Sequence, residues 1–286
     1  MRSKLFVPCT RPEFFAKALA GPADAISFDL EDSVPDDGKD VARAQLREFL
    51  GSDAGRAAAG RKRIIVRINA QGTRHFPADL AALSGLAVRL VNIPKVESAE
   101  DVRAAAAAVE AAIGDHGPLG PPGLLLNIET PRALAGAAEM ANAHPRVAGL
   151  QVGLNDLFEP LGITRSNPWH VHAALWAVRL ASAQTGCFAY DGAYADIADD
   201  EGFRREAELS RSLGFLGKSC IHPKQVAVAN EVFDRGNDLA DARRIVAAAR
   251  EAAAVGRGAF LLDGRMIDRP AIARAEAVLA RSEGGQ

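Results

Sequence analysis

Charged side chains stand at the ends of short apolar runs in this chain. The clearest case is LLLNIETPRA, residues 124–133, whose apolar run ends on Glu129 and is closed at once by Thr130 and Pro131. A carboxylate at the end of a buried strand is costly unless it is paired with a cation or bound to a metal. For a single residue, a solvated strand end is the simpler interpretation, so the rest of the chain must show whether the pattern repeats.

Seven of the eight apolar runs deliver a charged side chain near the end of the run. In chain order the polar residues are Asp29, Glu31 and Asp32, then Arg67 and Asn69, Lys95, Glu129, Asn155 and Asp156, Asp191, and Lys218 with His222 just beyond. Some of these would be polar by chance, because strand ends meet water. A ring that contains several carboxylates and several cations instead predicts a functional site, if the runs end at one rim.

The carboxylates predict a magnesium site. Glu129 and Asp156 follow neighbouring runs, so their side chains could lie within a few ångströms of each other. Two carboxylates with several waters are the usual protein ligands of Mg²⁺, at about 2.0–2.1 Å. The alternatives are an N-cap at Asp156 and a solvated strand end at Glu129. Zinc is disfavoured because the six His residues are scattered, and His170 and His172 face different ways on a predicted helix.

The cations predict an anion-binding role. Arg67 lies on a predicted strand, where a guanidinium can hold a carboxylate or an enolate oxygen through two hydrogen bonds. The alternative is a structural salt bridge with Asp29 or Glu31. Lys218 and His222 could stabilise charge or transfer protons, although the IHP motif also fits a simple strand end. Ser/His/Asp catalysis is unsupported because the chain has no GxSxG motif.

Eight short apolar runs alternate with Ala-rich stretches of helical character. The runs are 4–8, 25–30, 63–69, 88–95, 124–129, 147–153, 186–192 and 214–221. The predicted helices between them are 11–20, 39–50, 76–84, 98–113, 131–143, 168–185 and 200–213. Continuous hydrophobicity is typical of parallel strands covered by helices. Eight such units predict an α/β fold, a (β/α)8 TIM barrel, whose active site lies at the C-terminal strand ends. A doubly wound sheet is the alternative, but no Gly-rich nucleotide fingerprint follows the first strand.

The strand signal stops after residue 221. The sequence therefore predicts a barrel over 1–222 and a C-terminal helical extension, or arm, over 223–286. The extension reads as helices over 223–255, a short irregular segment, GRGAFLLDGRMIDRP, and a last helix over 270–282. Because a closed barrel has no room for it, we expect it to pack outside, to reach a neighbouring subunit, or to cover an active site.

Composition narrows the class of protein. With a net charge of −2 and a pI near 6.3, the chain offers no electrostatic case for binding nucleic acid or an anionic membrane. Its three Cys residues are far apart and form no CxxC pair, so neither a disulfide framework nor a cysteine zinc site is expected. No apolar stretch approaches the roughly 18 residues of a membrane span. We therefore expect a reducing, cytoplasmic compartment.

Eight motifs, taken in order, resemble one known family. They are RSKLFVP, FDLEDSV, VRIN, PKVES, NIETPRAL, GLNDL, AYDGAY and GFLGKSCIHPKQV. Together they cover nearly the whole chain and look like the citrate lyase β-subunit-like branch of the HpcH/HpaI aldolase family. The resemblance implies a (β/α)8 barrel that binds Mg²⁺ and makes or breaks a carbon–carbon bond next to a thioester. Family members include malyl-CoA and citramalyl-CoA lyases and the citryl-cleaving subunit of citrate lyase.

The resemblance also implies roles for particular residues. Glu129 and Asp156 match the metal ligands, with Glu129 also a substrate contact, and Arg67 matches the substrate-binding and catalytic arginine. Asp268, in the C-terminal arm, matches a catalytic acid/base that a neighbouring subunit lends, although an N-cap before Pro270 is an alternative that is compatible with it.

Other positions take supporting roles in the same hypothesis. Glu31, Asp32 and Lys95 are expected to orient metal-bound water or Arg67. Arg11 and Lys17 could meet CoA phosphates, or could equally form a solvated face. Cys9 stands where many relatives have Gly after FVP, which is a departure in the loop expected to contact the thioester carrier.

The implied activity is Mg²⁺-dependent cleavage of a β-hydroxyacyl-CoA thioester, of the citramalyl-CoA or malyl-CoA type, to acetyl-CoA and a 2-oxo acid. The alternatives are a citrate lyase β subunit that acts on citryl-acyl-carrier protein, a malyl-CoA thioesterase, a pyruvate-type aldolase, and a non-catalytic barrel that binds acyl-CoA. The intact carboxylate pair argues against the non-catalytic barrel. The resemblance further implies a homo-oligomer, a trimer or a multiple of one, with the arm reaching a neighbour's site.

Overall fold

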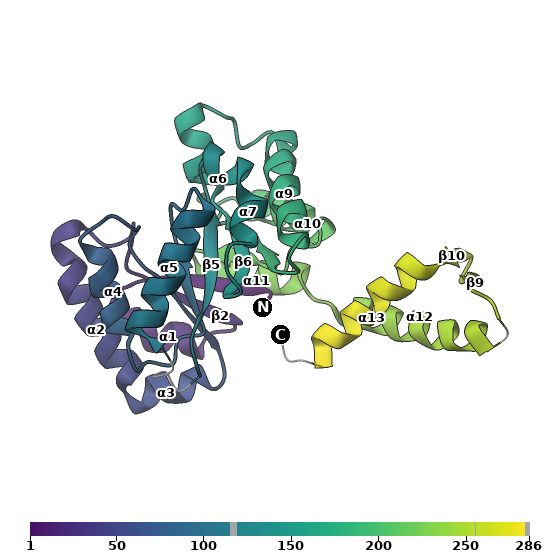
Figure 1. The fold of residues 1–286 in the computed structure, drawn as a ribbon, viewed down its shortest axis with the longest axis horizontal. Coiled ribbons are helices and arrows are strands. Elements are labelled where there is room, and N and C mark those ends of the chain that lie inside the picture. The colour runs from purple at the N-terminus through teal and green to yellow at the C-terminus, as the bar shows by residue number, and fades with distance from the viewer. Residues whose placement is uncertain (115–118, 255, 284–286) are drawn as a thin grey trace. The chain divides into compact units, whose positions relative to one another are not determined.

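The computed structural model describes residues 1–114, 119–254 and 256–283. The chain divides into two compact units, Met1–Phe233 and Asp234–Gln286 (Figure 1). The sequence predicts this boundary at residues 222 and 223. It lies later because helix α11 (Pro223–Val232) packs against β1 and α10 of the first unit.

The first unit is built around eight parallel strands. They are β1 (Ser3–Pro8), β2 (Ala25–Asp29), β3 (Arg63–Arg67), β4 (Leu90–Ile93), β5 (Gly123–Ile128), β6 (Val147–Val152), β7 (Phe188–Tyr190) and β8 (Lys218–Cys220). Their order in the sheet is β7-β6-β5-β4-β3-β2-β1-β8, so each strand from β1 to β6 pairs with the next one in the sequence, and β8 pairs with β1. Each strand falls within a predicted run or within one residue of it.

The sheet curves into a nearly closed barrel. Strand β8 pairs with β1 over three residues, and it meets β7 through an isolated parallel bridge between Asp191 and Lys218. The backbone completes this joint, because Asp191 N donates to Gly217 O over 2.9 Å and Ser219 N donates to Asp191 O over 3.0 Å. The predicted (β/α)8 barrel is therefore confirmed.

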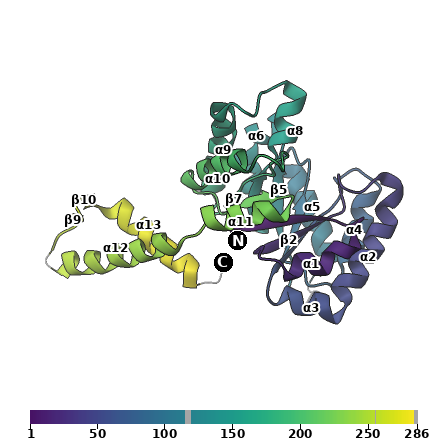
Figure 2. The same cartoon turned by 180° about the vertical axis from the view of Figure 1, so that it is seen from behind.

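Helices surround the strands (Figures 1 and 2). They are η1 (Pro12–Phe14), α1 (Phe15–Ala20), η2 (Asp36–Gly38), α2 (Lys39–Gly51), α3 (Asp53–Ala59), α4 (His75–Leu83), α5 (Ala99–Ala112), α6 (Pro131–Ala135), α7 (Ala137–Ala141), α8 (Leu154–Phe158), η4 (Glu159–Leu161), α9 (Pro168–Ala183), α10 (Asp200–Ser212) and α11. Side-chain caps begin several of them: Ser98 Oγ accepts from Asp101 N at α5, and Thr130 Oγ1 accepts from Ala133 N at α6. Helices α3 and α8 are not predicted from the sequence.

The strands present different side chains to their two faces. On β2, for example, Ile26 and Phe28 join the main apolar core beneath the helices, whereas Ala25 belongs to a small separate cluster with Ile65 and Leu125. This alternation, with a period of two residues, places the second cluster inside the barrel. Between that apolar cluster and the charged C-terminal strand ends lies a layer of buried polar side chains. The layer contains Lys4, Ser27, Asn92, Asn127, Gln151 and Ser219.

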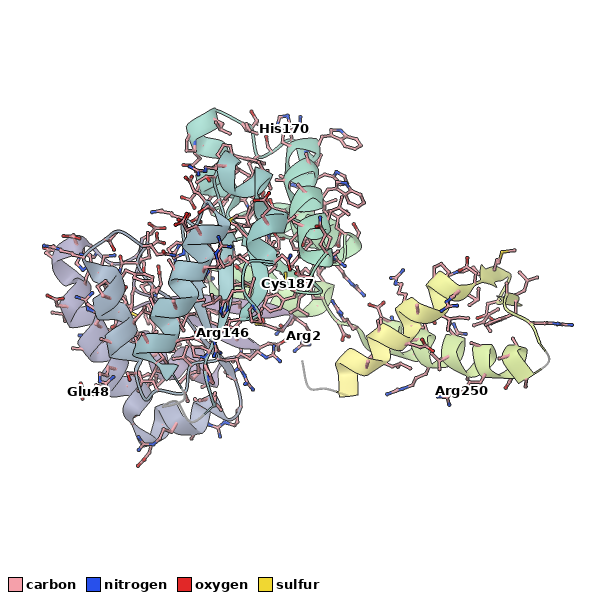
Figure 3. All side chains as sticks on the ribbon, viewed as in Figure 1. Arg2, Glu48, Arg146, His170, Cys187 and Arg250 are labelled. Atoms are coloured by element: carbon pink, nitrogen blue, oxygen red, sulfur yellow. The ribbon has the colours of Figure 1, made fainter. Side chains whose placement is uncertain are left out.

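The second unit contains two helices and a hairpin. They are α12 (Gly236–Ala254), β9 (Phe260–Leu262), β10 (Arg265–Ile267) and α13 (Arg269–Glu283), with exposed side chains such as Arg250 projecting from α12 (Figure 3). The prediction of an irregular segment is wrong here, because β9 and β10 pair as an antiparallel hairpin. Asp263 and Gly264 form its two-residue turn, with φ of 51° and 77°. No helix within the described ranges is long and apolar enough to cross a membrane.

Candidate active site

Arg67 and Asp29 form the centre of a charged cluster at the C-terminal strand ends. The two residues are register partners on adjacent strands, which places their side chains together at one rim. Arg67 Nε and Nη2 donate to the two oxygens of Asp29 over 2.8 Å each. Asp29 also accepts from the backbone N–H groups of Glu31 and Ser33. Although burial alone would raise it, Arg67 holds the pKa of Asp29 below its usual value.

Three further charged residues surround Arg67. Its Nη1 lies 2.8 Å from Glu31 Oε2 and 3.1 Å from Asp32 Oδ2. Lys95 Nζ lies 3.0 Å from Glu31 Oε1 and 3.7 Å from Asp32 Oδ1. Burial raises the pKa of Glu31 to about 7 in spite of Arg67, and the Asp32 carboxylate adds to the rise. Glu31 and Asp32 thus contact Arg67 directly, as a role in orienting it requires.

Arg67 therefore forms the structural salt bridge with Asp29 and Glu31 that was the alternative to anion binding. A guanidinium has five N–H groups. Arg67 donates two hydrogen bonds to Asp29 and one to Asp32, and its Nη1 also lies in ion-pair distance of Glu31. The carboxylates around Arg67 balance its charge, so the guanidinium is an oriented donor rather than a free positive charge. A role in substrate binding stays a prediction.

Glu129 is buried at the end of β5 and is held by two hydrogen bonds. Its Oε1 accepts from Lys95 N over 2.7 Å, and its Oε2 accepts from Asn127 Nδ2 over 3.0 Å. Lys95 adopts a left-handed backbone conformation, with φ of 55°, which is uncommon for a residue other than glycine. Burial raises the pKa of Glu129, and the neighbouring Asp156 carboxylate contributes to the rise.

Gly153 leaves the space that Glu129 occupies. A Cβ atom built on Gly153 would lie 2.5 Å from Glu129 Cβ and 2.8 Å from its Oε2. No real Cβ atom tolerates such contacts, so any larger residue here would displace the carboxylate. Gly153 is also the residue that precedes α8, which carries Asp156 in its first turn.

Asp156 lies at the same rim, exposed to solvent. Loss of hydration raises the pKa of its carboxyl, and the Asp32 carboxylate raises it further. Among the described residues, neither Asp156 nor Glu129 forms an ion pair with a cationic side chain. In the protein alone, the ionised form of both carboxylates is therefore disfavoured. A bound cation would stabilise that form.

The donor set fits Mg²⁺ better than a metal that requires a complete protein cage. The described part of the chain contains no group of three or more His, Cys, Asp or Glu side chains placed to hold a metal. Mg²⁺ needs only one or two carboxylates and keeps several waters. Glu129 and Asp156 would hold it, with the outer lone pairs of Glu129 available because each oxygen accepts only one hydrogen bond.

A polar cavity of about 390 Å³ adjoins the cluster. Glu31, Asp32 and Lys95 line one part of it, and Arg74 and His75 line another. Substrate pockets of small molecules fall in the range of roughly 300–1,000 Å³. The cavity is therefore large enough for the reacting end of a substrate.

Two residues that the sequence places at the rim lie elsewhere. Lys218 and Asp191 are fully buried, and Lys218 Nζ lies 2.8 Å from Asp191 Oδ2 and 2.7 Å from Glu206 Oε1. Their charges meet each other inside the protein, so they are not free for a substrate. His222 caps α11 by accepting from Lys224 N, which agrees with the structural interpretation of the IHP motif.

The residues proposed to contact the thioester carrier are exposed. Arg11 is paired with Glu13 and lies 4.6 Å from the ring centroid of Phe14, and Lys17 is exposed on α1. The positions of Arg11 and Lys17 neither support nor exclude a role in CoA binding. Cys9 is fully buried, and its backbone N–H donates to Asp29 O.

Asp268 belongs to the second unit and is exposed. Its Oδ1 accepts from Ala271 N over 3.3 Å, so the N-cap role expected as an alternative is present. A catalytic role for the same carboxylate stays a prediction.

Sequence reasoning missed Asn127, Gly153 and Phe6. Asn127 supports Glu129 from within the strand, and Phe6 places its ring 5.1 Å from the Arg67 guanidinium. The signal for Asn127 was available, because it is the one polar residue in the run LLLNI. Nothing in the sequence pattern singles out Gly153 or Phe6.

Comparison with known proteins decides the family. The family model described as HpcH/HpaI aldolase/citrate lyase matches residues 2–223, which is the barrel that carries this site. The chain belongs to the HpcH/HpaI aldolase/citrate lyase family. The resemblance seen in the eight motifs is thereby confirmed.

Members of this family with named activities match over nearly their whole length. An L-malyl-CoA/beta-methylmalyl-CoA lyase of Cereibacter sphaeroides is 36% identical over 306 residues, covering 99% of this chain and 94% of the relative. A (3S)-malyl-CoA thioesterase of the same organism is 37% identical over 284 residues, with the same coverage. The crystal structure of CitE from Mycobacterium tuberculosis in complex with magnesium, acetoacetate and coenzyme A has a TM-score of 0.75 and 35% identity, covering 99% of this chain and 100% of that one.

Proposed function

We propose that this chain is a Mg²⁺-dependent carbon–carbon lyase that cleaves a β-hydroxyacyl-CoA thioester of the malyl-CoA or citramalyl-CoA type. The products are acetyl-CoA and a 2-oxo acid. The observation that carries the proposal is the pair Glu129 and Asp156, two carboxylates at the barrel mouth that no described cationic side chain neutralises. Named lyases of the family support it, as does a relative solved with magnesium, acetoacetate and coenzyme A.

The bond chemistry accounts for the residue types at the site. Cleavage breaks the bond between the carbon that bears the hydroxyl and the α-carbon of the thioester. The hydroxyl loses its proton and becomes the carbonyl of the 2-oxo acid, while the electron pair passes to the thioester as an enolate. A proton then returns to the α-carbon, so the reaction is balanced and needs no oxidant. Mg²⁺, held by Glu129 and Asp156, would supply a Lewis acid for the hydroxyl and the adjacent carboxylate.

Arg67 and Asp268 take the remaining roles in the proposal. An N–H of Arg67 binds an oxygen on which negative charge develops, and Asp29 holds the guanidinium in place for it. The ion pairs of Glu31, Asp32 and Lys95 help to hold Arg67 in place at the mouth of the barrel. Asp268, lent by the arm of a neighbouring copy, protonates the α-carbon, or removes that proton in the condensation direction.

A thioesterase is the second candidate, because a relative so named is as similar to this chain as the lyases are. The two functions differ in product: a lyase releases acetyl-CoA and a 2-oxo acid, whereas a thioesterase releases free CoA and the hydroxy acid. Mass spectrometry of the CoA products from one substrate separates them directly.

The test is a panel of malyl-CoA, β-methylmalyl-CoA, citramalyl-CoA and citryl substrates, each with and without Mg²⁺. We expect acetyl-CoA from at least one CoA thioester, and only with the metal. Asp156→Ala should lose roughly 100-fold or more of this activity, because metal stabilisation is worth several kcal/mol. Glu159→Ala, three residues further on and exposed, is the matched control and should stay at the wild-type rate. A folded Asp156→Ala variant with wild-type activity would refute the metal assignment.

The proposal includes a homo-oligomer, a trimer or a multiple of one, since the arm of one copy must serve another. Large apolar side chains exposed on α9 are compatible with a contact between copies: Trp169 is 76% exposed, and Trp176 and Leu180 are 48% exposed. Sedimentation or light scattering would give the subunit number, and a monomer would exclude a lent Asp268.

A further inference from the structure

A chain of hydrogen bonds crosses the barrel interior and ends on Glu129. Lys4, on β1, donates from Nζ to Gln151 Oε1. Gln151, on β6, donates from Nε2 to Asn127 Oδ1 over 3.1 Å. Asn127, on β5, then donates from Nδ2 to Glu129 Oε2 over 3.0 Å. We call Lys4, Gln151 and Asn127 the interior column.

The column is sealed from solvent. Lys4 is 0% exposed, Asn127 is 2% exposed and Gln151 is 4% exposed. Among the described residues no carboxylate pairs with Lys4; its ammonium instead lies 4.2 Å from the ring centroid of Phe6. Burial lowers the pKa of Lys4 well below its usual value, and Arg67 lowers it further. Placing an amine at such a position is costly, so packing alone does not explain it.

The two ends of the column have opposite hydrogen-bonding character. The Lys4 amine carries N–H groups in either protonation state and a carboxylate only accepts, whereas an amide can turn over and exchange its donor and acceptor ends. Lys4 Nζ donates to the oxygen of Gln151, and the Gln151 NH₂ group then faces the oxygen of Asn127. The Asn127 NH₂ group is thereby directed at Glu129.

A neighbouring amide reinforces this direction. Asn92 Nδ2 donates to Asn127 Oδ1 over 2.8 Å and to Leu125 O over 2.9 Å. Asn92 thus presents a donor to the Asn127 oxygen that the column already uses as an acceptor. The arrangement therefore has one consistent orientation from Lys4 to Glu129.

We propose that Lys4 is a positioning residue for the metal site, which acts through Gln151 and Asn127 to fix the Glu129 carboxylate in the orientation that binds Mg²⁺. The proposal rests on the proposed function for the identity of the metal, but not on the reaction that follows. One hydrogen bond from Asn127 and one from Lys95 N leave each oxygen of Glu129 with lone pairs for the ion. Loss of partners that orient a metal ligand typically weakens metal binding by about 10–100-fold.

The test measures Mg²⁺ affinity directly, by isothermal titration calorimetry and by the rise of the melting temperature with Mg²⁺, on the full-length protein. Asn127→Leu removes the final donor and should weaken Mg²⁺ binding by roughly 10-fold or more. Lys4→Met should weaken it by about 10-fold, whereas Lys4→Gln keeps a donor for Gln151 and should stay within about threefold of the wild type. Because both Lys4 variants replace the amine with a neutral side chain, the difference between them reports the hydrogen bond.

Ser27→Ala is the matched control for disturbance of the barrel interior. Ser27 is fully buried in the same polar layer, and its Oγ forms no hydrogen bond within the described structure, so this variant should bind Mg²⁺ as the wild type does. At saturating Mg²⁺ the Lys4 variants should recover kcat, since only the affinity for the ion has changed.

The proposal is overturned if folded Asn127→Leu and Lys4→Met bind Mg²⁺ within twofold of the wild type, or if Lys4→Gln binds as weakly as Lys4→Met. If Lys4→Met lacks a cooperative melting transition, Gln151→Met replaces it, because it breaks the column at the next residue. Mg²⁺ binding by folded Gln151→Met within twofold of the wild type would then overturn the proposal. Failure of the proposed function has a different signature: the wild type would bind Mg²⁺ and the variants would follow the predicted order, yet no acetyl-CoA would form.

Discussion

Gly153→Ala tests whether the position of Glu129 controls the site. The added methyl would lie 2.5 Å from Glu129 Cβ, whereas carbon atoms in contact normally stand about 3.5–4.0 Å apart. Either Glu129 or the start of α8 must therefore move by about 1 Å. A displacement of that size can cost about 100-fold in rate. Overpacking of this kind also destabilises by about 1–3 kcal/mol.

The assay has two parts, both compared with Gly51→Ala, whose added Cβ would lie 3.9 Å from Leu86 Cδ2 in ordinary contact. First, kcat/KM for acetyl-CoA release should fall by roughly 100-fold in Gly153→Ala and stay unchanged in the control. Second, a loss of about 2 kcal/mol should lower the melting temperature by about 4–8 °C for a unit of this size. If Gly153→Ala keeps the wild-type kcat/KM and Mg²⁺ affinity, the exact placement of Glu129 does not matter and the reasoning fails.

Three further predictions concern charged groups. Lys218→Met leaves Asp191 without its buried cation, while Glu206 keeps its ion pair with Arg165. The variant should lower the free energy of unfolding by about 3–5 kcal/mol in urea titrations, and a variant within 1 kcal/mol of the wild type would contradict this. The pKa of Glu31 is raised to about 7 in the folded protein, so its contribution to stability is complete below about pH 4.5 and is lost as the pH rises through 7. Between pH 5 and pH 8 without Mg²⁺, the free energy of unfolding of Glu31→Gln should decline by up to about 3 kcal/mol less than that of the wild type. Equal declines in the two proteins would exclude the raised pKa of Glu31. Asp268→Ala should lower kcat by about 100-fold or more with Mg²⁺ affinity unchanged, and an unaltered kcat would leave that residue only its capping role.

The barrel strands could be predicted from the sequence because they are buried on both faces. Continuous apolar runs such as 124–129 indicate parallel strands when eight of them alternate with helical stretches. Glu129 stood out for the same reason, since a carboxylate interrupts the run. The Asp263–Gly264 turn carried an equally clear signal for the β9–β10 hairpin, because Asp-Gly between apolar residues favours a two-residue turn.

Other parts of the site depend on which residues meet across the barrel. The sequence shows that Lys218 and Asp191 follow strands, but not that they face each other instead of the rim. Lys4 looks like an ordinary polar residue near the N-terminus, and only the closure of the sheet brings it to Gln151. These contacts join positions 27 and 147 residues apart, and no local pattern encodes them.

The joint between β7 and β8 affects how the barrel responds to acid. The first and last strands are joined by regular pairing, whereas β7 and β8 meet through one isolated bridge and a few backbone hydrogen bonds, backed by buried charges from Asp191, Glu206 and Lys218. Acid that neutralises those carboxylates would loosen this joint before the apolar layer beneath the helices gives way.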